Sequence, residues 1–376
     1  MNAAIPTPRR PGFRSVGDNR VRLFGLTPGE RAGRFAAKTG IAAGGAGDGP
    51  VVLANLDYAC DPAWFAEVRD RPGHVLTLDG APVLAHALNA QAATAIEEAM
   101  RGGDGALPPG HVAWPAEAAG GLHSAALRKR EAPFVLRLTP DTADAAERAS
   151  YDGAYKGVTD VLTLYLWRRP AFYLTRWSAQ AGLSPNFITA VGAILCAAAF
   201  WLFWSGSYWP GIAAGFAFMV LDTVDGKLAR CTGTSSKWGN VFDHGIDLIH
   251  PPFWWWAWLH GLGAYGTPLA SDTADMALAV IVGGYVLQRV IEGVFMRRFG
   301  MHIHVWQRID SQFRLITARR NPNMVILVAA MLAGRPDIGI LLVAAWTVLS
   351  LVFHAVRMVQ AEVANARAGK VVSWLG

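Results

Sequence analysis

The stretch that decides the fold reads Asp222-Thr-Val-Asp225-Gly226-Lys-Leu-Ala229-Arg230, then eight residues, then Gly239-Asn-Val-Phe-Asp243-His-Gly-Ile-Asp247. On a helix, spacings of three and four residues place side chains on one face. The first half therefore presents Asp222 and Asp225 together, and the second half presents Asp243 and Asp247 together. Two antiparallel helices can bring these four carboxylates into one site.

Acidic side chains within apolar segments need a cationic partner. A carboxylate in a transmembrane helix costs about 2.5–3.5 kcal/mol on insertion scales, and like charges also repel. Oxygen ligands without His or Cys at metal spacing favour Mg²⁺, with Mn²⁺ as the alternative, and Mg²⁺ often shares its coordination with substrate phosphates. We therefore expect a divalent metal site facing a ligand that carries a diphosphate.

Small residues accompany the acids on the same helices. The helix surface carries little side-chain bulk at Gly226, Ala229 and Gly239, so a flat ligand can approach the backbone there. Arg230 adds a forked cation for phosphate oxygens. The alternative is an ion pathway in which the glycines serve helix packing, but that role does not call for the alanine and the arginine at these offsets.

At every fixed position the stretch matches D-x2-D-G-x2-A-R-x8-G-x3-D-x3-D, so the chain resembles the CDP-alcohol phosphotransferase family over about residues 155–360. The segment Ser184-Pro185-Asn186-Phe187-Ile188-Thr189 is similar to the family's entry into the first membrane span. The resemblance implies a six-helix membrane fold, usually a homodimer, with its active site at the cytoplasmic membrane surface.

The resemblance also implies the chemistry. A phospho-alcohol or phosphatidyl group would pass from a CDP-linked donor to a hydroxyl acceptor, a lipid or a polar alcohol phosphate, with release of CMP. The product would be a phospholipid or an inositol-phosphate-type phosphodiester. By this resemblance, two Mg²⁺ ions are held by Asp222, Asp225, Asp243 and Asp247, Asp247 is also the base, and Gly226, Ala229, Arg230 and Gly239 hold the CDP moiety. We expect His244 and His250, beside the motif, to be structural.

The composition agrees with a membrane protein. Of the 376 residues 52% are hydrophobic and 16% are charged, and the 15 tryptophans suit the water–lipid boundary. The net charge of +6 makes anionic lipid headgroups plausible neighbours. Nucleic acid is not expected as a partner, because the basic residues flank apolar segments instead of forming a stripe. The three cysteines, far apart in the sequence, are expected to be unpaired.

Apolar segments and charge predict the domain order. Residues 1–135 form a cytoplasmic α/β domain, 136–182 a linker with an amphipathic interfacial helix, 183–360 six transmembrane helices, and 361–376 a cytoplasmic tail. The spans fall at roughly 187–204, 209–229, 240–262, 276–296, 322–334 and 337–357, the short fifth one either borrowing 312–318 or packing tilted against other helices. Lys and Arg gather on one set of loops, so both ends and the active site should face the cytoplasm of a bacterial inner membrane. The first residues lack the apolar core of a secretory signal, so we expect insertion to rely on the internal spans.

In the first domain, the sequence pattern predicts strands at 51–56, 74–78 and 134–138 and a helix at 92–100. Its position resembles that of the nucleotidyltransferase domain in bifunctional inositol-phosphate cytidylyltransferase/phosphotransferase enzymes. A Gly-rich basic loop directly after the first strand is missing, and the nearest candidate is Phe24 to Arg31, so we expect a degenerate domain. Asp57 remains a weaker candidate residue there.

Two questions stay open at this point. A metal or small-solute transporter with a cytoplasmic regulatory domain is the alternative function, and it predicts charges in several spans. Apart from the motif the apolar segments carry few, notably Arg289 and Glu292. A basic cluster could bind an acceptor phosphate or a lipid headgroup, or only orient the protein; it comprises Arg297, Arg298, Arg308 and Arg314.

Overall fold

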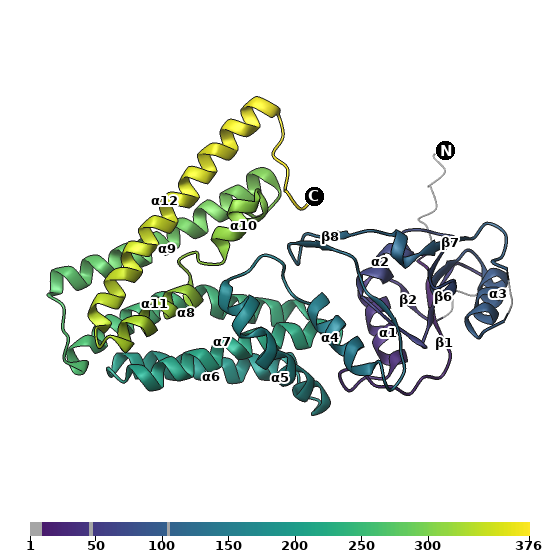
Figure 1. Ribbon diagram of the computed structural model, residues 1–376, viewed down its shortest axis with the longest axis horizontal. Helices are drawn as coiled ribbons and strands as arrows, with labels where there is room; N and C mark the ends of the chain where they lie inside the picture. The colour runs from purple at the N-terminus through teal and green to yellow at the C-terminus, as the bar shows by residue number, and fades with distance from the viewer. Residues whose placement is uncertain (1–9, 45–47, 104–105) are drawn as a thin grey trace, which may run out of the picture.

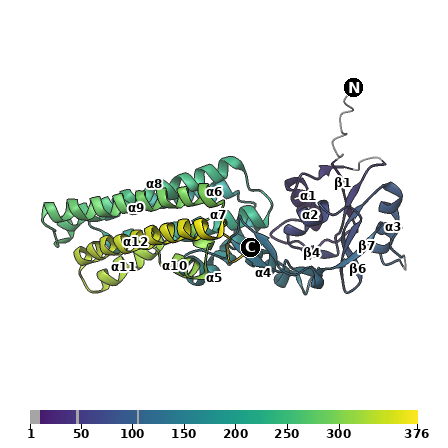
Figure 2. The same ribbon diagram turned by 90° about the horizontal axis from the view of Figure 1, so that it is seen from above.

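The computed structural model describes residues 10–44, 48–103 and 106–376, without the side chains of residues 237, 240 and 243. The molecule is elongated, with an α/β domain at one end and a bundle of long helices at the other (Figures 1 and 2). The motif lies on the two helices whose ends face the α/β domain.

The α/β domain is built on a mixed sheet of six strands in the order β2-β1-β3-β6-β5-β7. Its strands are β1 (Gly12–Val16), β2 (Ala42–Ala43), β3 (Val51–Asn55), β5 (His74–Leu78), β6 (Ala81–Ala87) and β7 (Val112–Pro115). β3 is buried throughout, as its unbroken apolar run indicates. The predicted strands at 51–56 and 74–78 are confirmed. The run at 134–138 contains β10 (Val135–Arg137), which pairs outside this sheet with β4 (Tyr58–Cys60).

Helices cover the sheet: α1 (Pro28–Lys38), α2 (Ala63–Arg69) and α3 (Ala90–Met100), with a 3₁₀ turn at Ala116–Ala118. α1 begins where it does because Thr27 and Glu30 form a capping box and Pro28 occupies the first helical turn. The stretch from Phe24 to Arg31 therefore serves as a helix start. Arg31 itself is buried and donates a hydrogen bond to Ser150 Oγ at 2.9 Å.

Three elements lie where the two parts of the molecule meet. The hairpin of β8 (Leu122–Ser124) and β9 (Lys129–Glu131) is the last part of the first domain, and it is followed by the helix α4 (Ala143–Gly153) and by α5 (Arg168–Gln180), which comes after a π-helical turn at Leu162–Leu166. α5 buries Phe172 and Thr175 on one face and exposes Tyr173 and Trp177. This amphipathic pattern agrees with the predicted interfacial helix, whose position at a membrane surface stays a prediction.

The bundle consists of α6 (Pro185–Trp204), α7 (Tyr208–Cys231), α8 (Lys237–Tyr265), α9 (Ser271–Phe299), α11 (Arg320–Leu332) and α12 (Pro336–Ala368). Between α9 and α11 lie a 3₁₀ turn at Ile303–Val305 and the short α10 (Arg308–Arg314). Among the described residues, α6, α9 and α12 are long and apolar enough to cross a membrane by length and composition. The fifth segment does not borrow residues 312–318, because the chain leaves the helix after α10 and begins α11 at Arg320. α12 continues into the predicted tail.

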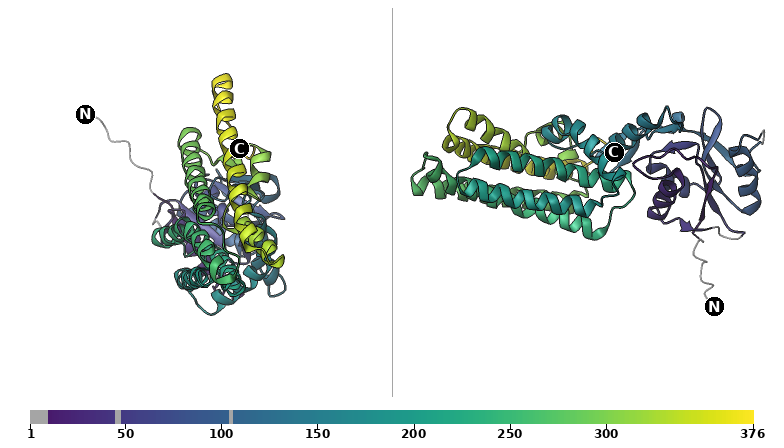
Figure 3. Two further views of the ribbon diagram at one scale, coloured as in Figure 1. Left: turned by 90° about the vertical axis from the view of Figure 1, so that its left-hand side faces the viewer. Right: turned by 90° about the horizontal axis from the view of Figure 1, so that it is seen from below.

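Aromatic side chains hold the bundle together. Trp254 and Trp258 of α8 are buried against Phe203 of α6, and the Trp254 indole N–H donates to the Cys196 carbonyl at 3.0 Å. The outer faces of α6, α9 and α12 carry exposed apolar side chains such as Ile194 and Leu349, which suits contact with lipid. Figure 3 shows the helices lying lengthwise beside one another with the α/β domain beyond one end. All three cysteines are buried and unpaired, as expected.

Candidate active site

Asp225 lies deepest among the predicted site residues, on the C-terminal half of α7. It is 3% exposed, and its Oδ2 accepts a 2.5 Å hydrogen bond from Thr189 Oγ1 of α6. Thr189 is held in place because Ser184 caps the start of α6. The other oxygen, Asp225 Oδ1, is buried without a hydrogen-bond partner among the described residues. A buried carboxylate oxygen in that position calls for a further ligand.

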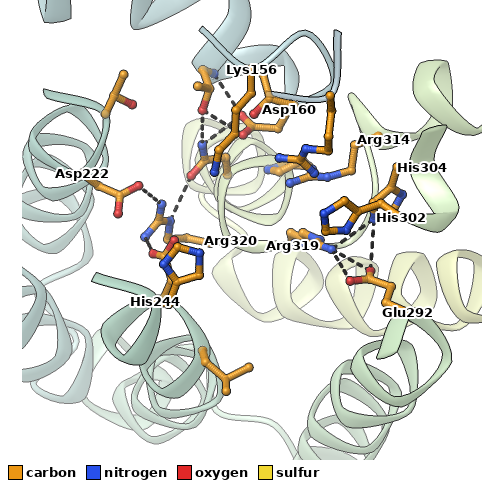
Figure 4. Close-up of a pocket in the computed structure, with 18 of the residues that line it drawn as sticks. Lys156, Asp160, Asp222, His244, Glu292, His302, His304, Arg314, Arg319 and Arg320 are labelled. Atoms are coloured by element: carbon orange, nitrogen blue, oxygen red, sulfur yellow. Dashed lines mark hydrogen bonds and ion pairs between the residues drawn. The ribbon is translucent and has the colours of Figure 1, made fainter. Parts of the chain in front are cut away.

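Asp222 and Asp247 meet through an arginine that the sequence analysis missed. Arg320, at the start of α11, donates to Asp222 Oδ2 at 2.8 Å (Figure 4) and to Asp247 Oδ1 at 2.7 Å. Its guanidinium also lies over the ring of Phe218, 4.8 Å from the centroid. In the sequence, the only sign of a role for Arg320 was its place beside Arg319 in a basic pair. Such a pair is explained equally well by the tendency of Lys and Arg to lie on the cytoplasmic side of a membrane.

Asp243 completes the predicted set on α8, but its side chain lies outside the part of the chain that the structure describes. It stands one helical turn before Asp247, so the two share a face of α8. The structure therefore brings three of the four predicted metal ligands to one place: Asp222, Asp225 and Asp247.

A cavity of about 460 Å³ opens beside these acids. Asp222, Asp247, Arg230 and Arg320 line one end of it. The volume is in the range of pockets that hold small-molecule ligands. Asp225 lies behind Asp222, and the two line a smaller recess together with Thr189.

The small residues predicted to hold CDP have close protein neighbours. A Cβ at Gly226 would lie 3.0 Å from Arg230 Nη2, and a Cβ at Gly239 would lie 2.7 Å from Asn186 Oδ1. Ala229 is half-buried on α7. Arg230 Nε donates to the Ala154 carbonyl at 3.0 Å, which points the arginine toward the linker side of the cavity. The part these residues take in nucleotide binding stays a prediction.

The two histidines beside the motif differ. His250 is buried between Phe218 and Trp254, and its Nδ1 lies 2.6 Å from the Ile246 carbonyl, so the structural role expected for it is supported. His244 is exposed and lines the cavity.

The far end of the cavity is basic. Arg319 Nη2 lies 2.6 and 2.7 Å from the two oxygens of Glu292, and Arg289 donates to the same carboxylate at 2.6 Å. Of the basic residues left open above, Arg314 lines this end. Arg298 instead pairs with Glu362, and Arg308 lies over Trp374.

One group of side chains at this end has metal-ligand spacing. The potential ligand atoms of Glu292, His304 and His354 lie within 4.8 Å of one another. The Arg319 guanidinium, however, contacts both Glu292 oxygens and lies 3.2 Å from His304 Nε2. Because the Arg319 guanidinium already contacts Glu292 and His304, we interpret these two side chains as the binding site of Arg319.

Asp160 organises the wall between the two ends. Its Oδ1 accepts hydrogen bonds from Asn321 Nδ2 at 2.9 Å and from the Thr163 amide at 3.0 Å. Burial opposes ionisation of Asp160, but the Arg314 charge and these hydrogen bonds outweigh burial and lower its pKa. Asp160 is therefore an ionised anchor for the start of α11, next to Arg320.

The residues present fit a hard divalent cation. The donors at Asp222, Asp225 and Asp247 are all carboxylate oxygens, and one of them, Asp225 Oδ1, is buried and unpartnered. This donor chemistry suits Mg²⁺ or Mn²⁺ better than softer metals.

Comparison with known proteins agrees with the motif. Residues 183–308 match the family model "CDP-alcohol phosphatidyltransferase". Cholinephosphotransferase 1 of Gallus gallus is 33% identical over 137 residues, covering 32% of this chain and 39% of that protein. Archaetidylinositol phosphate synthase of Pyrococcus horikoshii is 26% identical over 52% of this chain and 92% of its own length.

A solved structure is similar to half of the chain. The phosphatidylinositol phosphate synthase of Mycobacterium tuberculosis with CDP-DAG bound covers 50% of this chain and 94% of its own, with 18% identity and a TM-score of 0.40. The family match begins after the α/β domain, whose resemblance to nucleotidyltransferases stays a prediction. Residues 183–308 of this chain are therefore similar to the CDP-alcohol phosphatidyltransferase family, the family to which the aspartate motif also points.

Proposed function

We propose that this protein transfers a phospho-alcohol or phosphatidyl group from a CDP-linked donor to a hydroxyl acceptor and releases CMP. The observation that carries the proposal is that Asp222 and Asp247 line one cavity together with Arg230 and Arg320. Asp225 lies next to this cavity, in the smaller recess that it shares with Asp222. Carboxylates for metal and arginines for phosphate are the groups that a diphosphate donor requires.

Two Mg²⁺ ions would be held by Asp222, Asp225, Asp243 and Asp247, and when bound they would offset the negative charge of the diphosphate. Asp247 is the proposed base: its side chain is 45% exposed, so a substrate hydroxyl can reach it from the cavity. The acceptor oxygen attacks the phosphorus distal to cytidine, and its proton passes to Asp247. The bond from that phosphorus to the CMP phosphate breaks, and CMP leaves with the electron pair.

Arg230 is the proposed contact for the phosphates of the CDP moiety, with Gly226, Ala229 and Gly239 beside it. Arg230 lies on the same helix as Asp222 and Asp225, two turns further along. It can therefore contact a nucleotide phosphate while the aspartates stay on the metal side. Its hydrogen bond to Ala154 directs the guanidinium toward the cavity.

We further propose that α6, α7, α8, α9, α11 and α12 all cross the membrane of a bacterial cell, with both chain ends in the cytoplasm and two copies forming a dimer. α11 has 13 residues, so it rises only about 20 Å against a hydrocarbon core of about 30 Å. It can be shorter than a lipid-facing span because Met324 and Leu327 are buried among the other helices.

The test is a transfer assay with the purified protein. CDP-alcohols of several classes are incubated with Mg²⁺ and candidate acceptors, and CMP is measured with and without EDTA. Release of CMP that needs both metal and acceptor is expected, and Asp247→Asn should abolish it while Asp272→Asn, at the start of α9, should not. Equal CMP release from the Asp247→Asn protein would remove Asp247 as the base.

A further inference from the structure

The α/β domain contributes directly to the wall of the active-site cavity. The turn of its β8–β9 hairpin places Ala126 and Arg128 in the lining of the same 460 Å³ cavity that Asp222 and Asp247 line. Figure 1 shows β8 lying next to the C-terminus, between the α/β domain and the helical bundle. A residue of the first domain therefore shares one space with the catalytic motif.

The hairpin is fixed at this position from two sides. The Gly157 amide donates to the Leu127 carbonyl at 2.8 Å, and a Cβ at Gly157 would lie 2.6 Å from Lys129 Cβ. On the other side, Arg130 Nε donates to the carbonyl of Leu375 in the tail at 2.7 Å. The tail is itself tied to the bundle, because the Trp374 amide donates to the Trp306 carbonyl at 3.0 Å. The position of Arg128 thus results from the docked structure and not from a loose turn.

Arg128 has an unusual backbone. Its φ is +51°, a left-handed conformation that side chains with a Cβ rarely adopt. Glycine would occupy this position with less strain. An arginine that is kept in a strained turn and directed into a cavity indicates a use for its side chain.

The end of the cavity that Arg128 reaches carries more positive than negative charge. The basic residues there are Arg128, Lys156, Arg289, Arg314 and Arg319, against the carboxylates of Asp160 and Glu292. Arg314 is 7% exposed, and its Nε and Nη1 are buried without a hydrogen-bond partner among the described residues. Figure 4 shows Arg314 projecting into the cavity beside Arg319 and His302. Asp160 already offsets part of the Arg314 charge, but these two nitrogens have no hydrogen-bond acceptor among the described residues, and a bound anion would supply one.

Burial also affects Arg128 itself. It lowers the pKa of the guanidinium to about 10, and the neighbouring Arg319 acts in the same direction while Glu292 opposes it. Arg128 therefore remains charged at neutral pH, with Arg319 as a neighbour of like charge. A bound anion would relieve this repulsion.

We propose that the basic end of the cavity binds a phosphate group of the hydroxyl acceptor, and that Arg128 makes the α/β domain a part of this acceptor site. The inference rests on the proposed function, because it places the acceptor opposite the aspartates. In this proposal the α/β domain needs no nucleotidyltransferase activity. It closes the basic end of the cavity and selects acceptors that carry a phosphate.

The test uses the full chain in detergent and follows thermal unfolding. Inorganic phosphate should stabilise the unchanged protein, and Arg128→Gly should weaken phosphate binding about tenfold or more, the loss expected for one charge-assisted hydrogen bond. Glycine suits the positive φ, so the variant should fold at least as well as the unchanged protein. Arg20→Ala is the control, because it removes an 89% exposed charge from the same domain. Equal phosphate stabilisation of the unchanged and Arg128→Gly proteins would overturn the proposal.

Two further arms separate the sources of phosphate and the two proposals. In one arm, vesicles that contain phosphatidic acid replace inorganic phosphate, and neutral vesicles are the comparison. If only phosphatidic acid stabilises the protein, and Arg128→Gly loses this stabilisation, the acceptor is a lipid phosphate. If inorganic phosphate stabilises the protein, and Arg128→Gly loses this stabilisation, the acceptor is a soluble phosphate ester.

In the other arm, CMP with Mg²⁺ is the ligand, and Arg128→Gly should respond like the unchanged protein. Absence of any response to CMP and Mg²⁺ counts against the proposed function, whereas a normal CMP response with no phosphate response counts against the acceptor site alone.

Discussion

Arg320 of α11 donates a 2.8 Å hydrogen bond to Asp222 of α7, and the two residues are 98 positions apart in the sequence. Their side chains are 11% and 18% exposed, so the charges face each other largely out of water. The same guanidinium reaches Asp247 of α8. One arginine thus links the two motif helices with a third helix that carries none of the motif.

Replacing this arginine should expose the repulsion between the two carboxylates. Removing one partner of a buried pair typically costs about 3–5 kcal/mol, so Arg320→Ala should clearly lower the unfolding temperature. Mg²⁺ at the same carboxylates can replace the lost cation, so added Mg²⁺ should raise the unfolding temperature of Arg320→Ala more than that of the unchanged protein.

The matched control is Arg335→Ala, which removes a cation that is 55% exposed and pairs with Asp337 at 2.7 Å. Surface pairs contribute about 0–1 kcal/mol, so this variant should unfold like the unchanged protein and gain no extra response to Mg²⁺. An Arg320→Ala protein with unchanged stability and unchanged Mg²⁺ response would contradict a shared counter-ion role.

Thr189 should support the site through Asp225. Its hydroxyl donates the 2.5 Å hydrogen bond to Oδ2, and a hydrogen bond to a charged group is worth about 1.5–3 kcal/mol. Thr189→Val keeps the shape of the side chain but leaves the carboxylate free to rotate. We expect turnover to fall about tenfold to a hundredfold and half-saturation to require more Mg²⁺, with Thr189→Ser close to normal.

Thr347→Val provides the comparison, because Thr347 donates only to the Val343 carbonyl of its own helix. Kinetics at varied Mg²⁺ separate the two cases. A Thr189→Val enzyme that matches Thr347→Val at every Mg²⁺ concentration would show that Asp225 needs no orientation by α6.

The sequence predicts local structure and local chemistry well in this chain. The runs at 51–56 and 74–78 form strands because a β-rich apolar run between turns has few other ways to be buried. Asp222 and Asp225 meet because a spacing of three residues is a property of the helix itself. The six apolar segments all contain helices, but their lengths depend on packing, as the 13 residues of α11 show.

Contacts between distant segments could not be predicted in this way. Arg319 and Arg320 are neighbours in the sequence, yet one pairs with Glu292 and the other with Asp222 and Asp247. Nothing in their local pattern separates these roles from membrane orientation. Arg128 lies outside any motif, and its place in the cavity follows from docking of the hairpin on Gly157 and the tail.

Gly239 should tolerate no side chain. A Cβ there would lie 2.7 Å from Asn186 Oδ1 and 3.1 Å from Ser236 Oγ, the hydroxyl that caps α8. Gly239→Ala should therefore displace the start of the helix that carries Asp243 and Asp247, and activity should fall at least tenfold. Gly263→Ala is the control in the same helix, since nothing lies within 4 Å of its Cβ. It should be neutral or slightly stabilising, and equal activity of the two variants would contradict the close approach.

Asp160 should make stability depend on pH in one direction. Its pKa is lowered in the folded protein, so its contribution is present above the unfolded pKa of about 4 and is lost as the pH falls through the folded value. Asp160→Asn should therefore destabilise the protein at pH 7 by about 1–3 kcal/mol, and the difference should shrink on acidification. Unfolding temperatures measured from pH 7 downward give the difference between the two proteins. Asp18→Asn is the control, because the side chain of Asp18 is 85% exposed. A difference that grows toward acid pH would show that the sign is wrong.

The loop between the two halves of the motif contacts the α/β domain, and Gly233 is the residue that permits this contact. Arg34 Nη1 of α1 donates to the Thr232 carbonyl at 3.1 Å, and a Cβ at Gly233 would lie 3.0 Å from Arg34 Cβ and 3.3 Å from Phe35 Cε1. Gly233 also has a φ of +69°. Gly233→Ala should therefore cost backbone strain of about 1–2 kcal/mol and push α1 away from the motif loop.

Gly182→Ala separates these two costs, because Gly182 has a φ of +68° but nothing within 4 Å of its Cβ. Both variants should lose the strain energy, which thermal unfolding measures. Loosening of α1 from the motif loop should occur in Gly233→Ala alone, and faster proteolysis of the linker at 136–142 would report it. If the two variants are cleaved at the same rate, the glycine at 233 serves only the turn, and the docking of α1 does not hold the two motif helices in place.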